Sequence, residues 1–139
     1  MLQLPTTVIL LLLSLLVHSD PVYVKMDMTC DGIDQKFWCA DLYIYEEDYD
    51  DTHDILTFER FCASEKRKVF KWEFNPDGDV SPEYEIAYQV SHTCTPTGQY
   101  WCVRPEAVDV SVRGPQNVEF DVDLFNAENV TETACLPMY

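Results

Sequence analysis

SPEYEIAYQVSHTCTPTGQYWCVR, residues 81–104, contains a regular strand pattern that ends in a short turn. From Tyr84 to His92 every second residue is apolar or aromatic, and the residues between them are mostly polar. A period of two predicts a β-strand with one buried face. Residues 95–98, TPTG, then end this strand with turn chemistry. Cys94 and Cys102 flank the turn and are close enough in sequence for a disulfide bridge.

The same alternation recurs in five further runs, at residues 22–29, 40–45, 69–74, 108–112 and 118–124. Residues 55–62 add a strand whose register the pattern does not fix. A turn at residues 114–117 separates the last two runs, which we therefore expect to form a hairpin. No segment has a clear helical period. Seven to eight strands, each with one apolar face to bury, predict an all-β fold, an antiparallel β-sandwich of two sheets.

Residues 1–19 are predicted to be a secretory signal peptide that is cleaved before Asp20. The apolar run at residues 8–17 is broken only by Ser14 and is far too short to span a bilayer. A signal peptide usually carries Lys or Arg before its apolar run, and this chain has neither there. The alternative is therefore that residues 1–19 are not cleaved and anchor the chain to the membrane. No later apolar stretch is long enough to form a transmembrane segment. We expect residues 20–139 to form one secreted, extracellular domain with a short tail at 127–139.

The chain has six cysteines, and all of them follow the predicted signal peptide. They are Cys30, Cys39, Cys62, Cys94, Cys102 and Cys135. An even number in a secreted chain predicts up to three disulfides, for which fifteen connectivities exist. Zinc is the competing interpretation, but no pair has Cys-x-x-Cys spacing and the histidines do not cluster with the cysteines. We expect no metal centre and no cofactor.

The chain is strongly acidic, with a formal net charge of −16 at pH 7. Nucleic acids and anionic lipid surfaces would be repelled, whereas cations and basic proteins would be attracted. The simpler interpretation is that the charge only keeps an extracellular protein soluble. Six carboxylates gather in residues 46–54. Five of them could supply oxygens to Ca²⁺, namely Glu47, Asp48, Asp50, Asp51 and Asp54. This segment lacks the Gly-centred spacing of an EF-hand, and a solvated loop is the alternative.

Asn129 begins an Asn-Val-Thr acceptor for N-glycosylation, so we expect it on the surface. His92 shares the apolar side of its strand, where a lone histidine is more often structural than catalytic. His53 lies among carboxylates, which would favour its charged form. Neither histidine has a nucleophile beside it in the sequence.

A set of short motifs follows the same order as in a known family. They are Cys30-x-Gly32, LYIYEED at 42–48, DIL at 54–56, Tyr84-x-Ile86, His92-x-Cys94, Cys102-x-Arg104 and FDVDL at 120–124. With these motifs the chain resembles the nematode transthyretin-like secreted proteins over nearly all of residues 20–139. The two motifs that contain Cys94 and Cys102 are the specific part of the resemblance.

The resemblance implies a disulfide-stabilised transthyretin-like β-sandwich that binds an extracellular protein, a cell surface or a small molecule without catalysis. Residues 64–68 depart from the family's glycine-containing turn, and Cys39, Cys62 and Cys135 look additional. We therefore predict a bridge between Cys94 and Cys102 and assign no pairs to the other four cysteines. Strand edges permit a dimer without requiring one.

Two other functions remain open. The transthyretin fold also carries hydroxyisourate hydrolases, but their Tyr-Arg-Gly-Ser end is absent here, since the chain ends TACLPMY at residues 133–139. A hydrolase-like enzyme with a relocated site would depend on His92 and Arg104. The other alternative is a structural secreted protein that binds nothing tightly.

Overall fold

The computed structural model describes residues 20–32, 34, 36–47, 53–76, 81–128 and 135, which form eight strands and no helix. The strands are β1 (Val22–Thr29), β2 (Trp38–Glu47), β3 (His53–Ala63), β4 (Arg67–Phe74), β5 (Glu83–His92), β6 (Trp101–Val103), β7 (Val108–Ser111) and β8 (Gln116–Asp123). None of the described residues belongs to a helix with the length and hydropathy needed to cross a bilayer. The predicted signal peptide at residues 1–19 and the acceptor Asn129 lie outside the described residues.

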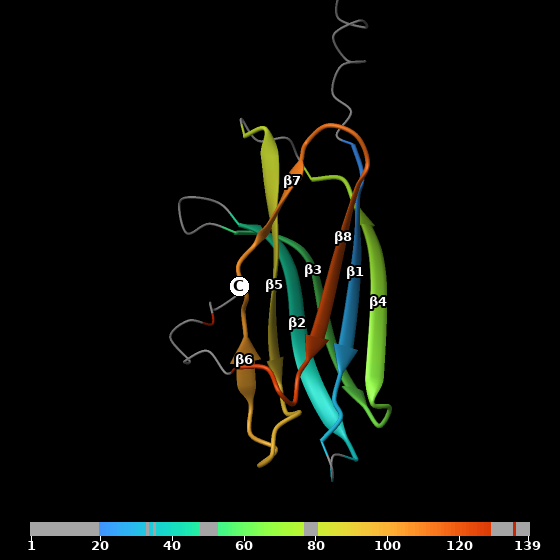
Figure 1. The fold of residues 1–139 in the computed structure, drawn as a ribbon, viewed down its shortest axis with the longest axis vertical. Coiled ribbons are helices and arrows are strands. Elements are labelled where there is room, and N and C mark those ends of the chain that lie inside the picture. Colours follow the sequence, from blue (N-terminus) through green and yellow to red (C-terminus); the bar gives the residue numbers. More distant parts are fainter. Residues whose placement is uncertain are drawn as a thin grey trace, which may run out of the picture.

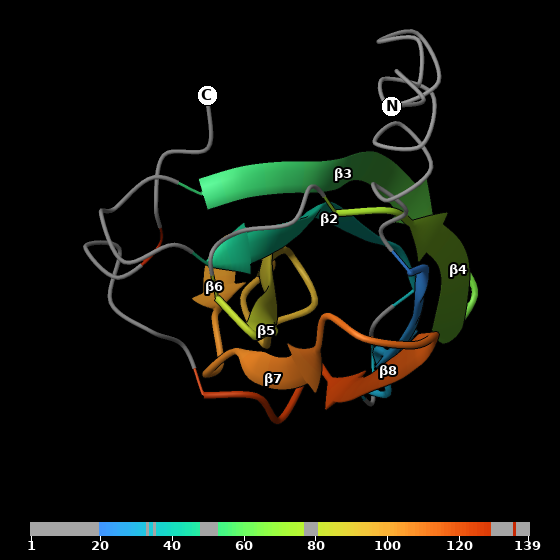
Figure 2. The same cartoon turned by 90° about the horizontal axis from the view of Figure 1, so that it is seen from above.

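The strands form two sheets that face each other (Figures 1 and 2). The smaller sheet has the order β4-β1-β8, and the larger has the order β3-β2-β5-β6 with β7 also paired to β5. Val103 of β6 pairs with Val90, and Val108 of β7 pairs with Ile86. The two short strands therefore act as one interrupted edge strand along β5. This arrangement confirms the predicted all-β sandwich of seven to eight strands.

The core lies between the sheets and is built from every second residue of the central strands. In β5 the side chains from Tyr84 to His92 that share one face are all buried, as the period of two predicts. Ala87 and Gln89 on the opposite face are buried as well, so the expectation of a single buried face does not hold in the middle of this strand. The facing row of β1 consists of Val22, Val24, Met26 and Met28, each at most 1% exposed. Burial of a side chain of this size stabilises the fold by about 1.5–3 kcal/mol. The alternating pattern thus selects the inward face of both sheets.

Two features of strand pairing differ from the sequence prediction. β1 and β8 are parallel, with Val24 opposite Val118, so the smaller sheet is mixed. The hairpin expected from the runs at 108–112 and 118–124 is wrong, because β7 pairs with β5 and β8 pairs with β1. The intervening turn, in which Gly114 has a φ of 76°, carries the chain from one sheet to the other. Alternation specifies which face a strand buries but not which strand it pairs with.

All six cysteines are paired, as Cys30–Cys94, Cys39–Cys62 and Cys102–Cys135. The predicted bridge between Cys94 and Cys102 is therefore wrong. Cys102 lies opposite Ser91, on the outer face of β5, whereas Cys94 follows the end of β5 and is fully buried. The turn between them thus places the two sulfur atoms on different sides of the larger sheet. The Cys30–Cys94 bridge instead joins the ends of β1 and β5, and so links the two sheets.

Candidate binding surface on the outer face of the larger sheet

Four side chains gather where β2 ends and β3 begins, and we call them the Arg104 cluster: Tyr45, Glu47, His53 and Arg104. Glu47 and His53 are directly opposite in the β2–β3 register. Arg104 follows β6; its Nε donates to the Tyr45 hydroxyl at 2.9 Å and its Nη2 donates to Glu47 Oε1 at 2.6 Å. The rings of Tyr45 and His53 are 5.1 Å apart. The cluster therefore ties the segment after β6 to the β2–β3 hairpin.

The charges of this cluster are fixed by burial and by hydrogen bonds. Burial raises the pKa of the Tyr45 phenol, and the neighbouring Arg104 opposes this shift only in part. For Arg104, burial acts to lower the pKa, but the Tyr45 hydroxyl and the Glu47 carboxylate outweigh it and raise the pKa. At neutral pH the phenol is neutral and the guanidinium is charged. Such a set of matched partners holds a surface in one shape.

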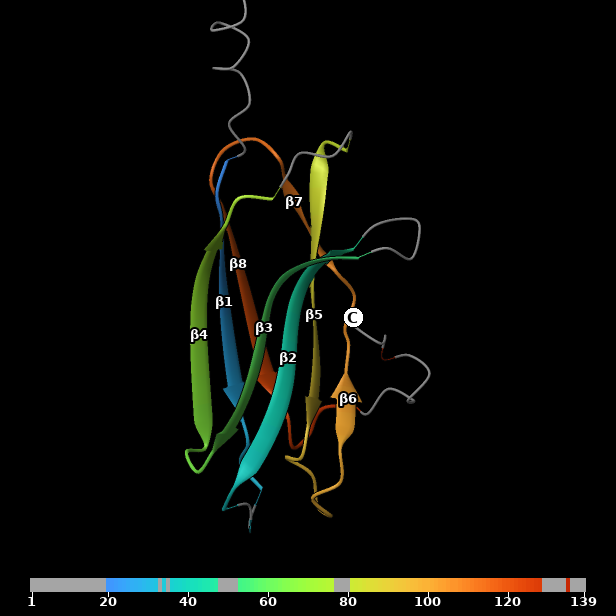
Figure 3. The ribbon, with the colours of Figure 1, turned by 180° about the vertical axis from the view of Figure 1, so that it is seen from behind.

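A second group, more exposed, lies farther along β2 and β3, and Tyr100, which precedes β6, interacts with it through Arg60. We call this group the Phe58 patch: Tyr43, Phe58, Arg60 and Tyr100. The Tyr43 and Phe58 rings are opposite in register, with centroids 4.6 Å apart. The Arg60 guanidinium carbon is 5.5 Å from the centre of the Phe58 ring. Phe58 is 42% exposed and Tyr100 is 63% exposed. Figure 3 shows β2 and β3 side by side on the near side of the molecule.

Arg60 is held in place on this patch by a carboxylate of the neighbouring strand. Its Nε and Nη2 donate to the two oxygens of Asp41 at 2.7 and 2.8 Å. This carboxylate is the main reason that the pKa of Arg60 is raised, and Tyr43 and Tyr100 add to the shift. A fork-shaped pair of hydrogen bonds restricts the guanidinium, so the exposed aromatic and cationic groups form a preordered surface.

The predicted calcium ligands are not brought together by the described structure. Glu47 is committed to Arg104, and Asp54 is exposed in β3. Asp48, Asp50 and Asp51 lie outside the described residues. Among the residues that the structure describes, no three metal-binding side chains form a group that could hold an ion. The calcium site stays a prediction.

His92 and Arg104, the residues of the hydrolase-like alternative, lie on opposite faces of the larger sheet. His92 is fully buried in the core, and this burial lowers its pKa to about 4 against a smaller opposing contribution from the Cys94 backbone. Arg104 follows Val103, which pairs with Val90, so the strand alternation directs Arg104 to the outer face where Tyr45 lies. The structure does not bring the two side chains into one site.

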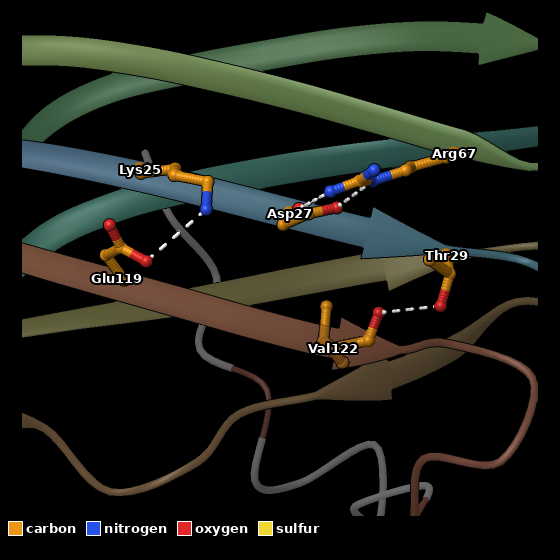
Figure 4. A network of polar contacts seen from close by, with 6 residues as sticks. All are labelled: Lys25, Asp27, Thr29, Arg67, Glu119 and Val122. Carbon is orange, nitrogen blue, oxygen red and sulfur yellow. Dashed lines mark hydrogen bonds and ion pairs between the residues drawn. The ribbon is translucent and has the colours of Figure 1, made fainter.

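The outer face of the smaller sheet carries a polar network that sequence reasoning missed (Figure 4). Lys25 Nζ is 3.3 Å from Glu119 Oε2, across the parallel β1–β8 pair. Arg67 donates two hydrogen bonds to the carboxylate of Asp27, and these are the main reason that the pKa of Asp27 is lowered. The only signal in the sequence was that Lys25 and Asp27 alternate with apolar residues, and their partners depend on the order of the strands in the sheet.

A hollow of about 230 Å³ lies beside this network. It is lined by Tyr23, Val24, Lys25, Lys71, Trp72, Asn117, Val118 and Glu119. Lys71 is directly opposite Lys25 in the β1–β4 register, and it forms no ion pair with a described residue. Sites for drug-sized ligands usually enclose about 300–1,000 Å³, so this hollow is small for such a ligand.

Comparison with known proteins identifies the family of the chain. A family model described as "Caenorhabditis elegans protein of unknown function (DUF870)" matches residues 25–137. The comparisons with curated proteins and with solved structures gave no match. The matched range begins inside β1 and contains β2 to β8, all three disulfides and both groups on the larger sheet. The chain therefore belongs to this nematode family.

Proposed function

We propose that this protein is a secreted, non-catalytic binding module of transthyretin-like type, and that its Phe58 patch binds an extracellular protein with a cationic surface. The exposed ring of Phe58, held between Tyr43 and Arg60, is the observation that carries the proposal. Aromatic and arginine side chains dominate the energetic centres of protein interfaces. The transthyretin-like relationship is part of the proposal and rests on the ordered motifs from Cys30-x-Gly32 to residues 120–124.

Secretion is supported by the cysteine chemistry together with the predicted signal peptide. Three disulfides account for all six cysteines. Bridges of this kind persist in oxidising compartments and are rare in a reducing cytosol. The Asn129 acceptor fits the same compartment.

Charge supports a cationic protein as the partner. The chain carries a net charge of −16, and the Arg60 charge within the patch is matched by Asp41. An acidic protein attracts basic partners over long range, and salt screens this attraction. The neighbouring aromatic rings would then supply the short-range contact.

The test is the binding of the full chain, produced by secretion and fluorescently labelled, to cultured cells and to extracellular matrix over a salt series. We expect saturable binding that weakens as salt rises. Phe58→Ala should weaken the binding by about tenfold, the loss typical of one interface anchor. Val108→Ala is the matched control, because Val108 is similarly exposed but lies on β7. Absence of saturable binding, or equal losses in the two variants, would overturn the proposal.

A further inference from the structure

β4 is an edge strand whose inner row of side chains is not fully covered. Among the described residues it pairs with β1 alone. Phe70, Trp72 and Phe74 point to the interior side but remain half-buried, whereas Met26, opposite Phe70 on β1, is fully buried. An edge strand with free backbone groups is a template for pairing with another chain.

The three rings form one continuous stack along this edge. The centroids of Phe70 and Trp72 are 5.3 Å apart with nearly parallel planes, and those of Trp72 and Phe74 are 6.2 Å apart. Aromatic pairs on neighbouring strands are among the favourable cross-strand contacts of sheets. A strand added beside β4 would therefore be stabilised most if it also presented aromatic side chains on this face.

The outer row of β4 carries two opposite charges that form no ion pair within the described part of the chain. Lys71 and Glu73 are exposed and follow each other on the same face of the strand. Neither forms an ion pair with a described residue, although five of the basic side chains do. Lys71 also faces the like charge of Lys25 across the β1–β4 pair, and directly opposed like charges destabilise a sheet. An added strand with a carboxylate opposite Lys71 would relieve this.

One arrangement of two identical strands meets both requirements. We propose that two copies of this chain associate through antiparallel β4 strands, with the two-fold axis at Trp72. This register places Trp72 opposite itself, Phe70 opposite the partner subunit's Phe74, and Lys71 opposite the partner subunit's Glu73. The two three-stranded sheets then form one sheet of six strands. The Phe70–Phe74 and Lys71–Glu73 pairings each occur twice and the Trp72–Trp72 pairing occurs once on the axis, because a two-fold interface uses the same surface on both copies.

Other registers of the same strands lose these contacts. An axis at Lys71 or at Glu73 places a charge opposite its own copy. An axis at Phe70 leaves Lys71 opposite the partner subunit's Val69. A shift by a single residue would bring the aromatic row of one copy to the charged face of the other. A lysine on an edge strand usually prevents that strand from pairing with edge strands of other chains. Here the opposite charges of Lys71 and Glu73 make one register of pairing favourable.

The test is the oligomeric state of the full secreted chain by sedimentation velocity over a range of concentrations. We expect a concentration-dependent dimer. Lys71→Glu or Glu73→Lys alone should weaken dimerisation by about 30-fold or more, because each places like charges opposite one another at two points. An equimolar mixture of the two variants should form a heterodimer, since every opposed pair is then attractive. The double variant should regain the wild-type affinity. Lys36→Glu is the matched control, with the same charge change at an exposed position outside β4.

Three results would overturn the proposed dimer. They are a wild-type chain that stays monomeric up to about 1 mM, single variants that dimerise like the wild type, and a mixture of the two variants that does not associate. Circular dichroism of each variant confirms that the monomer is folded. The Phe58 patch belongs to the other sheet and shares no residue with these variants, so the failure of one proposal leaves the other standing.

Discussion

Arg104 donates a hydrogen bond from Nη2 to Oε1 of Glu47, at 2.6 Å and across 57 residues of sequence. Glu47 is the last residue of β2, and Arg104 belongs to the segment between β6 and β7, the two short strands that pair with β5. Because Nε of the same side chain bonds the Tyr45 hydroxyl, the arginine spans two partners on one strand. This contact fixes the position of the interrupted edge relative to the β2–β3 hairpin.

We predict that Arg104→Ala lowers the free energy of unfolding by about 2 kcal/mol. The substitution removes the two hydrogen bonds that Arg104 donates to Tyr45 and Glu47, and it leaves the Glu47 carboxylate without this partner. Arg60→Ala is the matched control. The Arg60 side chain is 71% exposed, so loss of its pair with Asp41 should cost about 0–1 kcal/mol. Urea unfolding followed by fluorescence measures both values. Equal costs would mean that Arg104 does not anchor the segment after β6.

The buried His92 predicts a pH dependence of stability. Its pKa is lowered from 6.5 to about 4 in the folded chain, so the unfolded chain binds the proton more tightly. Stability is therefore complete above about pH 6.5 and falls as pH decreases towards 4, by a total of about 3 kcal/mol. Asp27 also has a lowered pKa in the folded chain, but its effect on stability is lost only below about pH 3.8, the pKa of the unfolded carboxyl, and so lies outside the range from pH 4 to 6.5. In urea unfolding at several pH values, His92→Gln should flatten the slope between pH 4 and 6.5. Curves that stay parallel to those of the wild type would contradict this assignment.

Gly32 allows a close approach of Phe125 to the backbone. A Cβ atom on Gly32 would lie 2.5 Å from Cε2 of the Phe125 ring. We predict that Gly32→Ala destabilises the chain by about 1–3 kcal/mol through overpacking. In a double-mutant cycle measured by thermal unfolding, Phe125→Leu should recover part of this loss, because leucine lacks Cε2, the ring atom closest to the added Cβ. Strictly additive effects would show that the two positions do not compete for space.

The three disulfides predict a specific peptide map. Proteolysis without reductant should release Cys30 linked to Cys94, Cys39 linked to Cys62, and Cys102 linked to Cys135. Removing the Cys30–Cys94 bridge, which spans 64 residues, should cost about 4 kcal/mol, against about 3 kcal/mol for the Cys39–Cys62 bridge, which spans 23. Mass spectrometry reads the map, and paired Cys→Ser variants give the energies. A peptide that links Cys94 to Cys102 would contradict the structure.

Local sequence was sufficient for most of the strands and their inward faces, but not for the short strand β6 or for the register of residues 55–62. The alternation from Tyr84 to His92 predicts both the strand β5 and its inward side, because these depend on the residues of one strand alone. The same reasoning could not pair the strands. Residues 108–112 and 118–124 have equivalent patterns whether they pair with each other or with β5 and β1. Such pairings depend on which strands lie next to each other in the folded sheets, and the pattern within one strand does not specify its neighbours.

The contacts of the candidate surface were equally hidden in the sequence. Arg104 was visible only as part of a Cys-x-Arg motif, and Glu47 as one of six carboxylates. Their contact requires β5 to lie beside β2 and β6 to continue along β5. The disulfide pairing failed for a related reason, because proximity in sequence did not place Cys94 and Cys102 on one side of the sheet.

The disulfide pattern has a consequence for proteolysis. Every peptide bond from Cys30 to Cys94 lies inside a loop closed by Cys30–Cys94, and every bond from Cys102 to Cys135 lies inside the loop closed by the last bridge. A single cut within either loop leaves one covalently joined molecule. No bridge spans residues 95–101, of which 96–100 are exposed. Between Cys30 and Cys135, one protease cut can leave two fragments with no covalent link only at this turn.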